Sequence, residues 1–262
     1  MIKAAFFDID GTLVSFKTHS IPESTKSAIA ELKEKGIKTF IATGRPFYAI
    51  DNLDGLEFDG YITMNGACCL NRELQVIYSN PVSCDNIDSL IRYQKEVFSF
   101  PCMFASKDEV FVNRIDENVE EIIRQINFIT PDIRPLEDAC KEEVLQLMGF
   151  FGIEREPEIM EIALPDCIAA RWSPLFTDIV AKGTSKQTGM DCLLDFYDIN
   201  IRDVIAFGDG GNDIPMLQHA PLSVAMGNAR EEVKKSASYI TDHIDEDGIR
   251  KALEHLEIIG KS

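Results

Sequence analysis

The sequence has no long hydrophobic run, no excess of basic residues and no paired-cysteine motif. No stretch approaches the roughly 18 to 20 apolar residues that span a bilayer, and the first residues lack the basic start and apolar run of a signal peptide. Lys+Arg 26 against Asp+Glu 44 leaves a net charge of −18. That balance argues against a nucleic-acid or anionic-membrane partner. An anionic substrate would therefore need a local positive site.

Cysteine and histidine usage excludes two further classes. The seven cysteines include no C-x-x-C pair, and their odd number suits a reducing compartment rather than a disulfide framework. The four histidines are scattered, with no zinc-binding spacing. We therefore expect a cytoplasmic protein. Nothing in the sequence indicates an oligomeric state.

Strands and helices alternate along most of the chain, which predicts an α/β fold with a doubly wound parallel sheet of the Rossmann-like type. The pattern predicts strands at 2–7, 37–43, 59–64, 203–208, 222–226 and 238–240, and helices at 22–35, 45–53, 184–197, 213–219, 229–235 and 246–257. Asn65-Gly66 is a strong hairpin signal, with further strands at 67–70 and 75–79.

The middle of the chain has a different texture. Helical patterns at 87–98 and 117–128 are mixed with strand-like runs at 101–106, 109–113, 143–151 and 167–172. This order predicts an inserted α+β domain with an antiparallel sheet. We expect a core formed by 1–81 and 179–262, interrupted once by an insert at 82–178.

The sharpest motif is "FFDIDGT", residues 6–12, in which a buried apolar run ends in Asp8 and Asp10. Two carboxylates at a strand end repel each other and lose hydration, so a bound divalent cation is the simplest compensation. Gly11 allows a sharp turn there. The alternative is an acidic β-turn, since Asp-Gly is a common turn pair.

Two other strand ends carry polar groups that would meet Asp8 at the carboxyl edge of a parallel sheet. "GDGGND" (208–213) supplies Asp209 and Asp213, whose oxygens could complete a Mg²⁺ site, with Asp213 as a plain helix cap the alternative. "TGR" (43–45) offers a hydroxyl and exposed amides for a phosphate oxygen, or a simple turn.

A lysine after the insert could supply a point positive charge to a phosphate. Lys186 opens the helix that follows "GTS", and Lys182, four residues earlier, is the other candidate. Either could instead be a solvated surface lysine.

These four signals, in this order, resemble the haloacid dehalogenase-like hydrolase superfamily over essentially the whole chain. The long insert, with "NGA" at 65–67 and "DGI" at 247–249, resembles its Cof-type branch, which has an α/β cap of the C2B kind. In that branch the lysine commonly sits in G-x-S-K-G, whereas Gln187 follows Lys186 here.

The resemblance implies a role for each motif residue. Asp8 would be the nucleophile that forms an aspartyl-phosphate, and Asp10 the acid and then the base. Mg²⁺ would bind Asp8, the Asp10 backbone carbonyl and Asp209, with Asp213 binding it directly or through water. The groups implied to hold the phosphoryl oxygens are Thr43, the Gly44 amide, Lys186 and Asn212.

The resemblance implies a Mg²⁺-dependent phosphatase that acts on small phosphorylated metabolites, with sugar phosphates as the main substrate class. One alternative is a hexose-phosphate mutase, which returns the phosphoryl group to its substrate. A different class is a phospho-acceptor signalling domain, but Asp10 two residues after the nucleophile and a large insert favour turnover.

Specificity is expected from the insert rather than from the core motifs. The segment "ARWSPLFTD" (170–178) carries the only tryptophan, Trp172, beside Arg171, a pair suited to a polyhydroxylated anionic ligand. Packing of the insert against the core is the alternative role for Trp172. Arg45 is a further candidate for binding the substrate.

Overall fold

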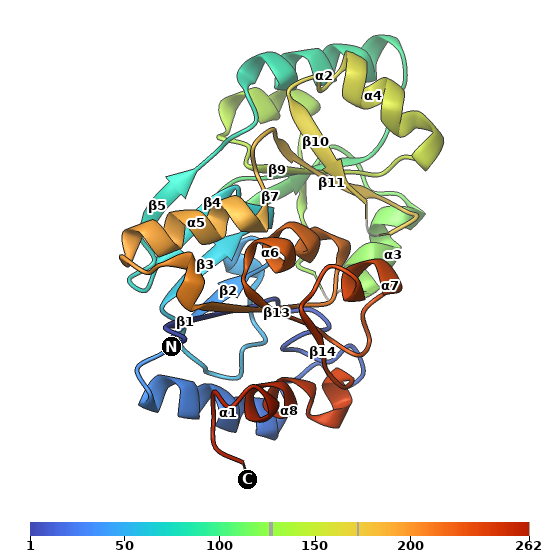
Figure 1. The fold of residues 1–262 in the computed structure, drawn as a ribbon. Coiled ribbons are helices and arrows are strands. Elements are labelled where there is room, and N and C mark those ends of the chain that lie inside the picture. The colour runs from blue at the N-terminus through green and yellow to red at the C-terminus, as the bar shows by residue number, and fades with distance from the viewer. Residues whose placement is uncertain (126–127, 172, 262) are drawn as a thin grey trace. The chain divides into compact units, whose positions relative to one another are not determined.

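The computed structural model describes residues 1–125, 128–171 and 173–261. The chain divides into two compact units. The first comprises Met1–Gly44, Ile50–Tyr78 and Ser185–Ser262, and the second comprises Arg45–Ala49 and Ser79–Thr184. Each unit contains a β-sheet and its own helices (Figure 1).

The first unit is organised around an eight-stranded sheet in the order β14-β13-β12-β1-β2-β3-β4-β5. Neighbouring strands from β14 to β3 pair in parallel, and β4 runs antiparallel to β3. The strands are β1 (Ala4–Phe7), β2 (Lys38–Ala42), β3 (Gly60–Thr63), β4 (Cys68–Asn71), β5 (Val76–Ser79), β12 (Val204–Gly208), β13 (Leu222–Ala225) and β14 (Tyr239–Ile240).

Helices cover both faces of this sheet (Figure 1). On one face lie α1 (Glu23–Glu34) and α8 (Gly248–His255), which contact each other. On the other lie α5 (Lys186–Phe196), α6 (Ile214–His219) and α7 (Glu231–Lys234), whose apolar side chains share one buried cluster with those of the strands. The predicted doubly wound α/β fold is confirmed.

The central strand β1 is apolar at every position because both of its faces are covered. Phe6 stacks on Phe40 of β2, with ring centroids 4.7 Å apart, and Phe7 stacks on Phe207 of β12 at 5.0 Å. Successive side chains of a strand point to opposite faces, so Phe6 contributes to the packing on one face of the sheet and Phe7 to the packing on the other. The polar residues that follow β1 therefore begin where the buried strand ends.

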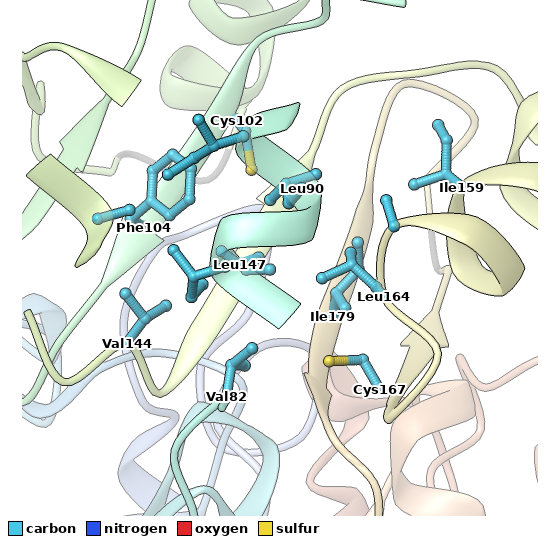
Figure 2. Close-up of a cluster of buried hydrophobic side chains, with 14 of the residues drawn as sticks. Val82, Leu90, Cys102, Phe104, Val144, Leu147, Ile159, Leu164, Cys167 and Ile179 are labelled. Carbon is cyan, nitrogen blue, oxygen red and sulfur yellow. The ribbon is translucent and has the colours of Figure 1, made fainter. Parts of the chain in front are cut away.

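The second unit has a six-stranded sheet in the order β10-β11-β9-β6-β7-β8, antiparallel except between β7 and β8. Figure 2 shows its core, where Leu90, Phe104, Leu147 and Ile179 gather with other buried side chains. The elements are β6 (Cys102–Ala105), β7 (Val110–Val112), β8 (Asp132–Ile133), β9 (Gln146–Gly149), β10 (Cys167–Ala170), β11 (Thr177–Ala181), α2 (Cys84–Glu96), α3 (Glu117–Gln125) and α4 (Glu156–Ile162).

Short 3₁₀ turns complete both units. They are η1 (Phe47–Ala49), η2 (Met64–Gly66), η3 (Leu136–Lys141), η4 (Ile153–Arg155), η5 (Ile201–Asp203), η6 (Gly211–Asp213) and η7 (Ile244–Glu246). The prediction of a helix at 45–53 was wrong, since only the single turn η1 forms there.

Among the described helices, none has the length and apolar character needed to cross a membrane.

The strand β11 was not predicted. All five of its residues are buried, and it pairs with β10 and β9. The expected boundary between residues 178 and 179 falls inside this strand, whereas the second unit continues to Thr184. The assignment of 82–178 as a separate functional domain therefore stays a prediction, with bounds that differ from those of this unit.

Candidate functional site

Parallel pairing brings three strand ends of the first unit to one edge of its sheet. Phe7 is in register with Ile41 of β2 and with Phe207 of β12. The residues that follow these strands, Asp8, Thr43 and Asp209, therefore emerge at the same edge, as expected for a ligand site in such a sheet.

The loop after β1 bends back close to the loop after β12. Gly11 has φ +89°, and a Cβ at this position would lie 2.3 Å from Oδ2 of Asp209. The hydroxyl of Thr12 donates to Oδ1 of Asp209 at 2.8 Å. Glycine at position 11 thus permits both the left-handed turn and the close approach of the two loops.

Lys186 lies fully buried at the start of α5, directly after the N-cap residue Ser185. Its Nζ donates to Oδ1 of Asp8 at 2.6 Å and to Oδ1 of Asp213 at 2.7 Å. Lys182 is exposed and belongs to the second unit. The ammonium group beside Asp8 in the described structure is therefore that of Lys186.

Asp213 is held in place by the backbone of its own loop. Its Oδ2 accepts from the amides of Asp209 at 3.0 Å and Gly210 at 2.8 Å, and its side chain is fully buried. A Cβ at Gly208 would lie 2.6 Å from the Cβ of Asp213, so glycine is needed there. These contacts fix the carboxylate beside Lys186.

Three carboxylates meet at this edge. Ligand oxygens of Asp8, Asp209 and Asp213 all lie within 4.8 Å of one another. Burial, with the nearby charges of Asp213, Asp209 and Asp10, raises the pKa of Asp8 well above its ordinary range, although Lys186 opposes the shift. Burial and Asp213 likewise raise the pKa of Asp209 to about 7.

The ammonium of Lys186 offsets only part of this negative charge. Burial lowers the pKa of a lysine, but the carboxylates of Asp213 and Asp8 outweigh that effect and raise the pKa of Lys186 above its ordinary value. The cluster therefore carries three acids against one fixed cation. A close set of carboxylate oxygens that Lys186 neutralises only in part fits Mg²⁺, a hard cation that takes oxygen ligands.

The side chain of Asp10 is placed differently from these three. It is half-buried, its backbone bridges to Val14, and its carboxylate is outside the cluster of Asp8, Asp209 and Asp213. The carboxyl group of Asp10 is thus set apart from the three carboxylates that lie together.

Thr43 and Gly44 lie next to Asn65, a residue that sequence reasoning did not assign to the site. The backbone amide of Asn65 donates to the Thr43 carbonyl at 3.0 Å, and a Cβ at Gly44 would lie 3.3 Å from the Asn65 side chain. Asn212 donates through Nδ2 to Oδ1 of Asn65 at 2.8 Å. Asn65 thus links the strand ends of β2 and β12, and its φ of +56° matches the Asn-Gly turn signal.

Asn228 is a second residue that the motifs did not point to. Its Nδ2 donates to the Gly11 carbonyl at 2.8 Å and to Oδ2 of Asp209 at 3.3 Å, and its Oδ1 accepts from the Ile244 amide at 3.1 Å. It follows β13, so only the strand order of the folded sheet brings it here.

The remaining predicted residues belong to the second unit or lie outside the described residues. Arg45 donates to the carbonyl of Ala49 at 3.3 Å. Trp172 lies outside the described residues. Arg171 pairs with Glu156 at 2.8 Å and donates to the carbonyls of Phe151 and Phe176. Its guanidinium therefore joins three segments of the second unit, and its expected role beside a ligand stays a prediction.

Similarity to known proteins extends over nearly the whole chain. The sequence model described as haloacid dehalogenase-like hydrolase matches residues 5–253. The chain is 35% identical over 260 residues to a protein of Bacillus subtilis (strain 168) named "Putative phosphatase YkrA", with 98% of each chain covered.

Two solved structures are similar over nearly the full length. One, BT4131, is described as a HAD subclass IIB sugar phosphatase, with 43% identity, a TM-score of 0.91, and 98% of this chain and 100% of that chain covered. The other, BT1666 from Bacteroides thetaiotaomicron, is described among phosphatases of the same superfamily. It has 38% identity, a TM-score of 0.92, and 99% of this chain and 96% of that chain covered.

Proposed function

Because the chain belongs to the haloacid dehalogenase-like hydrolase family and is a phosphatase, we propose that it hydrolyses phosphate monoesters of small metabolites, with Mg²⁺ and through a phosphoryl group carried on Asp8. The observation that carries this proposal is the buried contact of Lys186 with Asp8 and Asp213 at the carboxyl edge of the sheet. It joins a nucleophile, an acid cluster and a fixed cation in one place.

Asp8 is the proposed nucleophile. Its side chain is held by Lys186 and lies at the end of the rigid strand β1, so one carboxylate oxygen can be aimed at phosphorus with little motion. Attack forms an aspartyl-phosphate and releases the alkoxide of the leaving group.

Asp10 is the proposed acid and base. Its carboxyl would protonate the leaving alkoxide and then take a proton from the water that hydrolyses the aspartyl-phosphate. The half-buried position of Asp10 leaves one side of the residue toward solvent, which supports this exchange. Mg²⁺ held by Asp8, Asp209 and Asp213 with the Asp10 carbonyl would neutralise charge on the phosphoryl group.

Four groups are proposed to bind the phosphoryl oxygens. Lys186 supplies a fixed positive charge, and Thr43, the Gly44 amide and Asn212 supply uncharged donors. The link through Asn65 between Thr43 and Asn212 supports their acting on the same group.

Sugar phosphates are the proposed substrate class, supported by the similarity to the sugar phosphatase BT4131. The second unit is proposed to act as the cap that selects the leaving group, with Arg45 and Trp172 as candidates. Free thiols at all seven cysteines support a cytoplasmic location. A hexose-phosphate mutase remains the alternative, because it uses the same nucleophile.

The test measures inorganic phosphate released from a panel of sugar phosphates, nucleotides and pyridoxal phosphate, with Mg²⁺ or EDTA. We expect release from sugar phosphates that EDTA abolishes and Mg²⁺ restores. Interconversion of positional isomers without free phosphate would favour the mutase, and activity that survives metal removal would contradict the mechanism.

Replacement of the nucleophile gives a second test. Asp8→Asn should abolish turnover while leaving the melting temperature near that of the wild type, because the amide that replaces the proposed nucleophile cannot form an acyl-phosphate. Retention of even a tenth of the wild-type rate would overturn the assignment. Asp10→Asn should instead lower the rate by roughly 10² to 10⁴ and prolong the phosphorylated state of Asp8.

A further inference from the structure

The helix that carries Lys186 lies against a strand that carries a cysteine. Helix α5 packs on β3 and β4 in the first unit (Figure 1). The thiol of Cys69, on β4, approaches the carbonyl of Gly189 with Sγ···O of 3.8 Å. A Cβ at Gly189 would lie 3.2 Å from that Sγ and 2.5 Å from Ile62. Cys69 therefore lies directly beneath the Gly189 face of α5.

A second cysteine lies on the same face of the helix. Cys192 follows Gly189 by three residues, a spacing that places both on one side of an α-helix. It packs against the buried cluster that contains Cys69, and it lies on the part of α5 where the Cys69 thiol meets the Gly189 carbonyl. Cys69 is fully buried, whereas Cys192 is only half-buried. The pair thus combines a half-buried cysteine with a fully buried one.

The two thiols differ in acidity as well as in exposure. The hydrogen bond from Cys69 lowers the pKa of Cys192 to about 7, against the opposing effects of burial and of Asp191 and Asp195. The same contact, together with burial, raises the pKa of Cys69. The half-buried member is therefore the one with thiolate character, which is the form that reacts with oxidants.

We propose that Cys69 and Cys192 form a peroxide-sensitive pair that closes to a disulfide between β4 and α5 and reversibly lowers turnover. The Cys192 thiolate attacks one oxygen of a hydroperoxide and becomes a sulfenic acid. The O–O bond breaks, and the other oxygen leaves as hydroxide or alkoxide, which is protonated to water or an alcohol. Cys69 then attacks that sulfur and expels hydroxide, which leaves as water with the Cys69 proton. Two thiols lose two electrons in total, and one peroxide gains them.

The effect on turnover follows from the position of Lys186 on α5, and this part rests on the proposed function. A disulfide brings the two sulfur atoms to about 2.05 Å, which pulls the helix against β4. Lys186 lies six residues before Cys192 and makes both of its ion pairs through one nitrogen atom. Since a misplacement of about 1 Å can cost about 10²-fold in rate, we expect a fall of roughly 10-fold to 10²-fold.

The experiment treats the full-length protein with hydrogen peroxide and follows mass, disulfide mapping and phosphate release. We expect a loss of two hydrogens, a peptide cross-link between residues 69 and 192, a fall in turnover, and recovery with dithiothreitol. Cys69→Ser and Cys192→Ser should each abolish the cross-link and the loss of turnover. Cys68→Ser is the matched control, because Cys68 neighbours Cys69 in β4 but points to the opposite face.

Three results would overturn the proposal. They are a Cys192 oxidised to sulfinic acid with no cross-link, a cross-link that leaves turnover unchanged, and a loss of turnover that persists in both serine variants. The cross-link is read by mass alone. Failure of the proposed phosphatase activity would therefore be seen separately from failure of the thiol pair.

Discussion

Asn228 acts at the scale of a single residue by joining two loops of the site. One amide group donates to the Gly11 carbonyl and to the Asp209 carboxylate, and its carbonyl oxygen accepts from Ile244. Partners of this kind orient a metal-binding carboxylate, and their loss typically costs 10–100-fold in metal affinity or activity.

Asn228→Ala should therefore weaken Mg²⁺ binding by roughly 10-fold to 100-fold, measured by calorimetry on protein without substrate. Asn200→Ala is a suitable control, because Asn200 also accepts a backbone hydrogen bond but caps the separate turn η5. An unchanged Mg²⁺ affinity in Asn228→Ala, with only a lower melting temperature, would limit Asn228 to a structural role.

Residues adjacent to strand ends were the part of the site that sequence could predict. Parallel strands bring the residues that follow their apolar runs to one edge of the sheet. The residues in such positions are Asp8, Asp10, Thr43, Asp209 and Asp213. The sequence did not predict Asn65 and Asn228 as part of the candidate site, because their contacts depend on which loops become neighbours in the fold.

At the scale of elements, helix α5 depends on a close backbone contact at its first turn. Gly66 has φ +102°, and a Cβ there would lie 2.1 Å from the carbonyl oxygen of Ser185, the residue before Lys186. Any larger side chain must push apart η2 and the start of α5. Since the obstacle is backbone, neighbouring side chains cannot relieve it by changing rotamer.

Gly66→Ala should lower both stability and turnover, because Lys186 moves with its helix. Gly36→Ala is the matched control, since Gly36 also has a positive φ, +73°, but its Cβ would meet nothing within 4 Å. Both variants pay the cost of left-handed backbone, of order 1 kcal/mol, but only Gly66→Ala should lose about 10-fold or more in kcat. Equal kcat values in the two variants would contradict the link between η2 and Lys186.

The elements of the first unit were predicted more closely than those of the second. Alternating strands and helices gave clear boundaries in the core, whereas β11 lies in a run interrupted by Asp178, a buried polar residue that breaks the apolar pattern. The helix predicted after Pro46 is the opposite error, because an element was predicted there that does not form. Proline suits a first helical turn, but three residues of 3₁₀ turn were all that formed.

The stability of the whole molecule should depend on pH through the acid cluster. In the metal-free protein the pKa of Asp209 is raised to about 7, against about 3.9 for an aspartate in an unfolded chain. Between these values the folded state binds more protons than the unfolded state, so the free energy of unfolding falls as pH rises. The contribution of this group is complete below about pH 4 and is lost as the pH rises through about 7. Asp8 shifts in the same direction.

Mg²⁺ should reverse this trend, because a divalent cation binds the ionised carboxylates and competes with protons. We expect the increase in melting temperature caused by Mg²⁺, relative to EDTA, to be larger at pH 8 than at pH 5. Calorimetric scans at both pH values measure it, with Asp209→Asn as the comparison, since that variant removes one titrating group and one proposed ligand together. In Asp209→Asn both the Mg²⁺ effect and its pH dependence should shrink. A Mg²⁺ effect that is the same at pH 5 and pH 8 in the wild type would mean that the cluster does not exchange protons for metal.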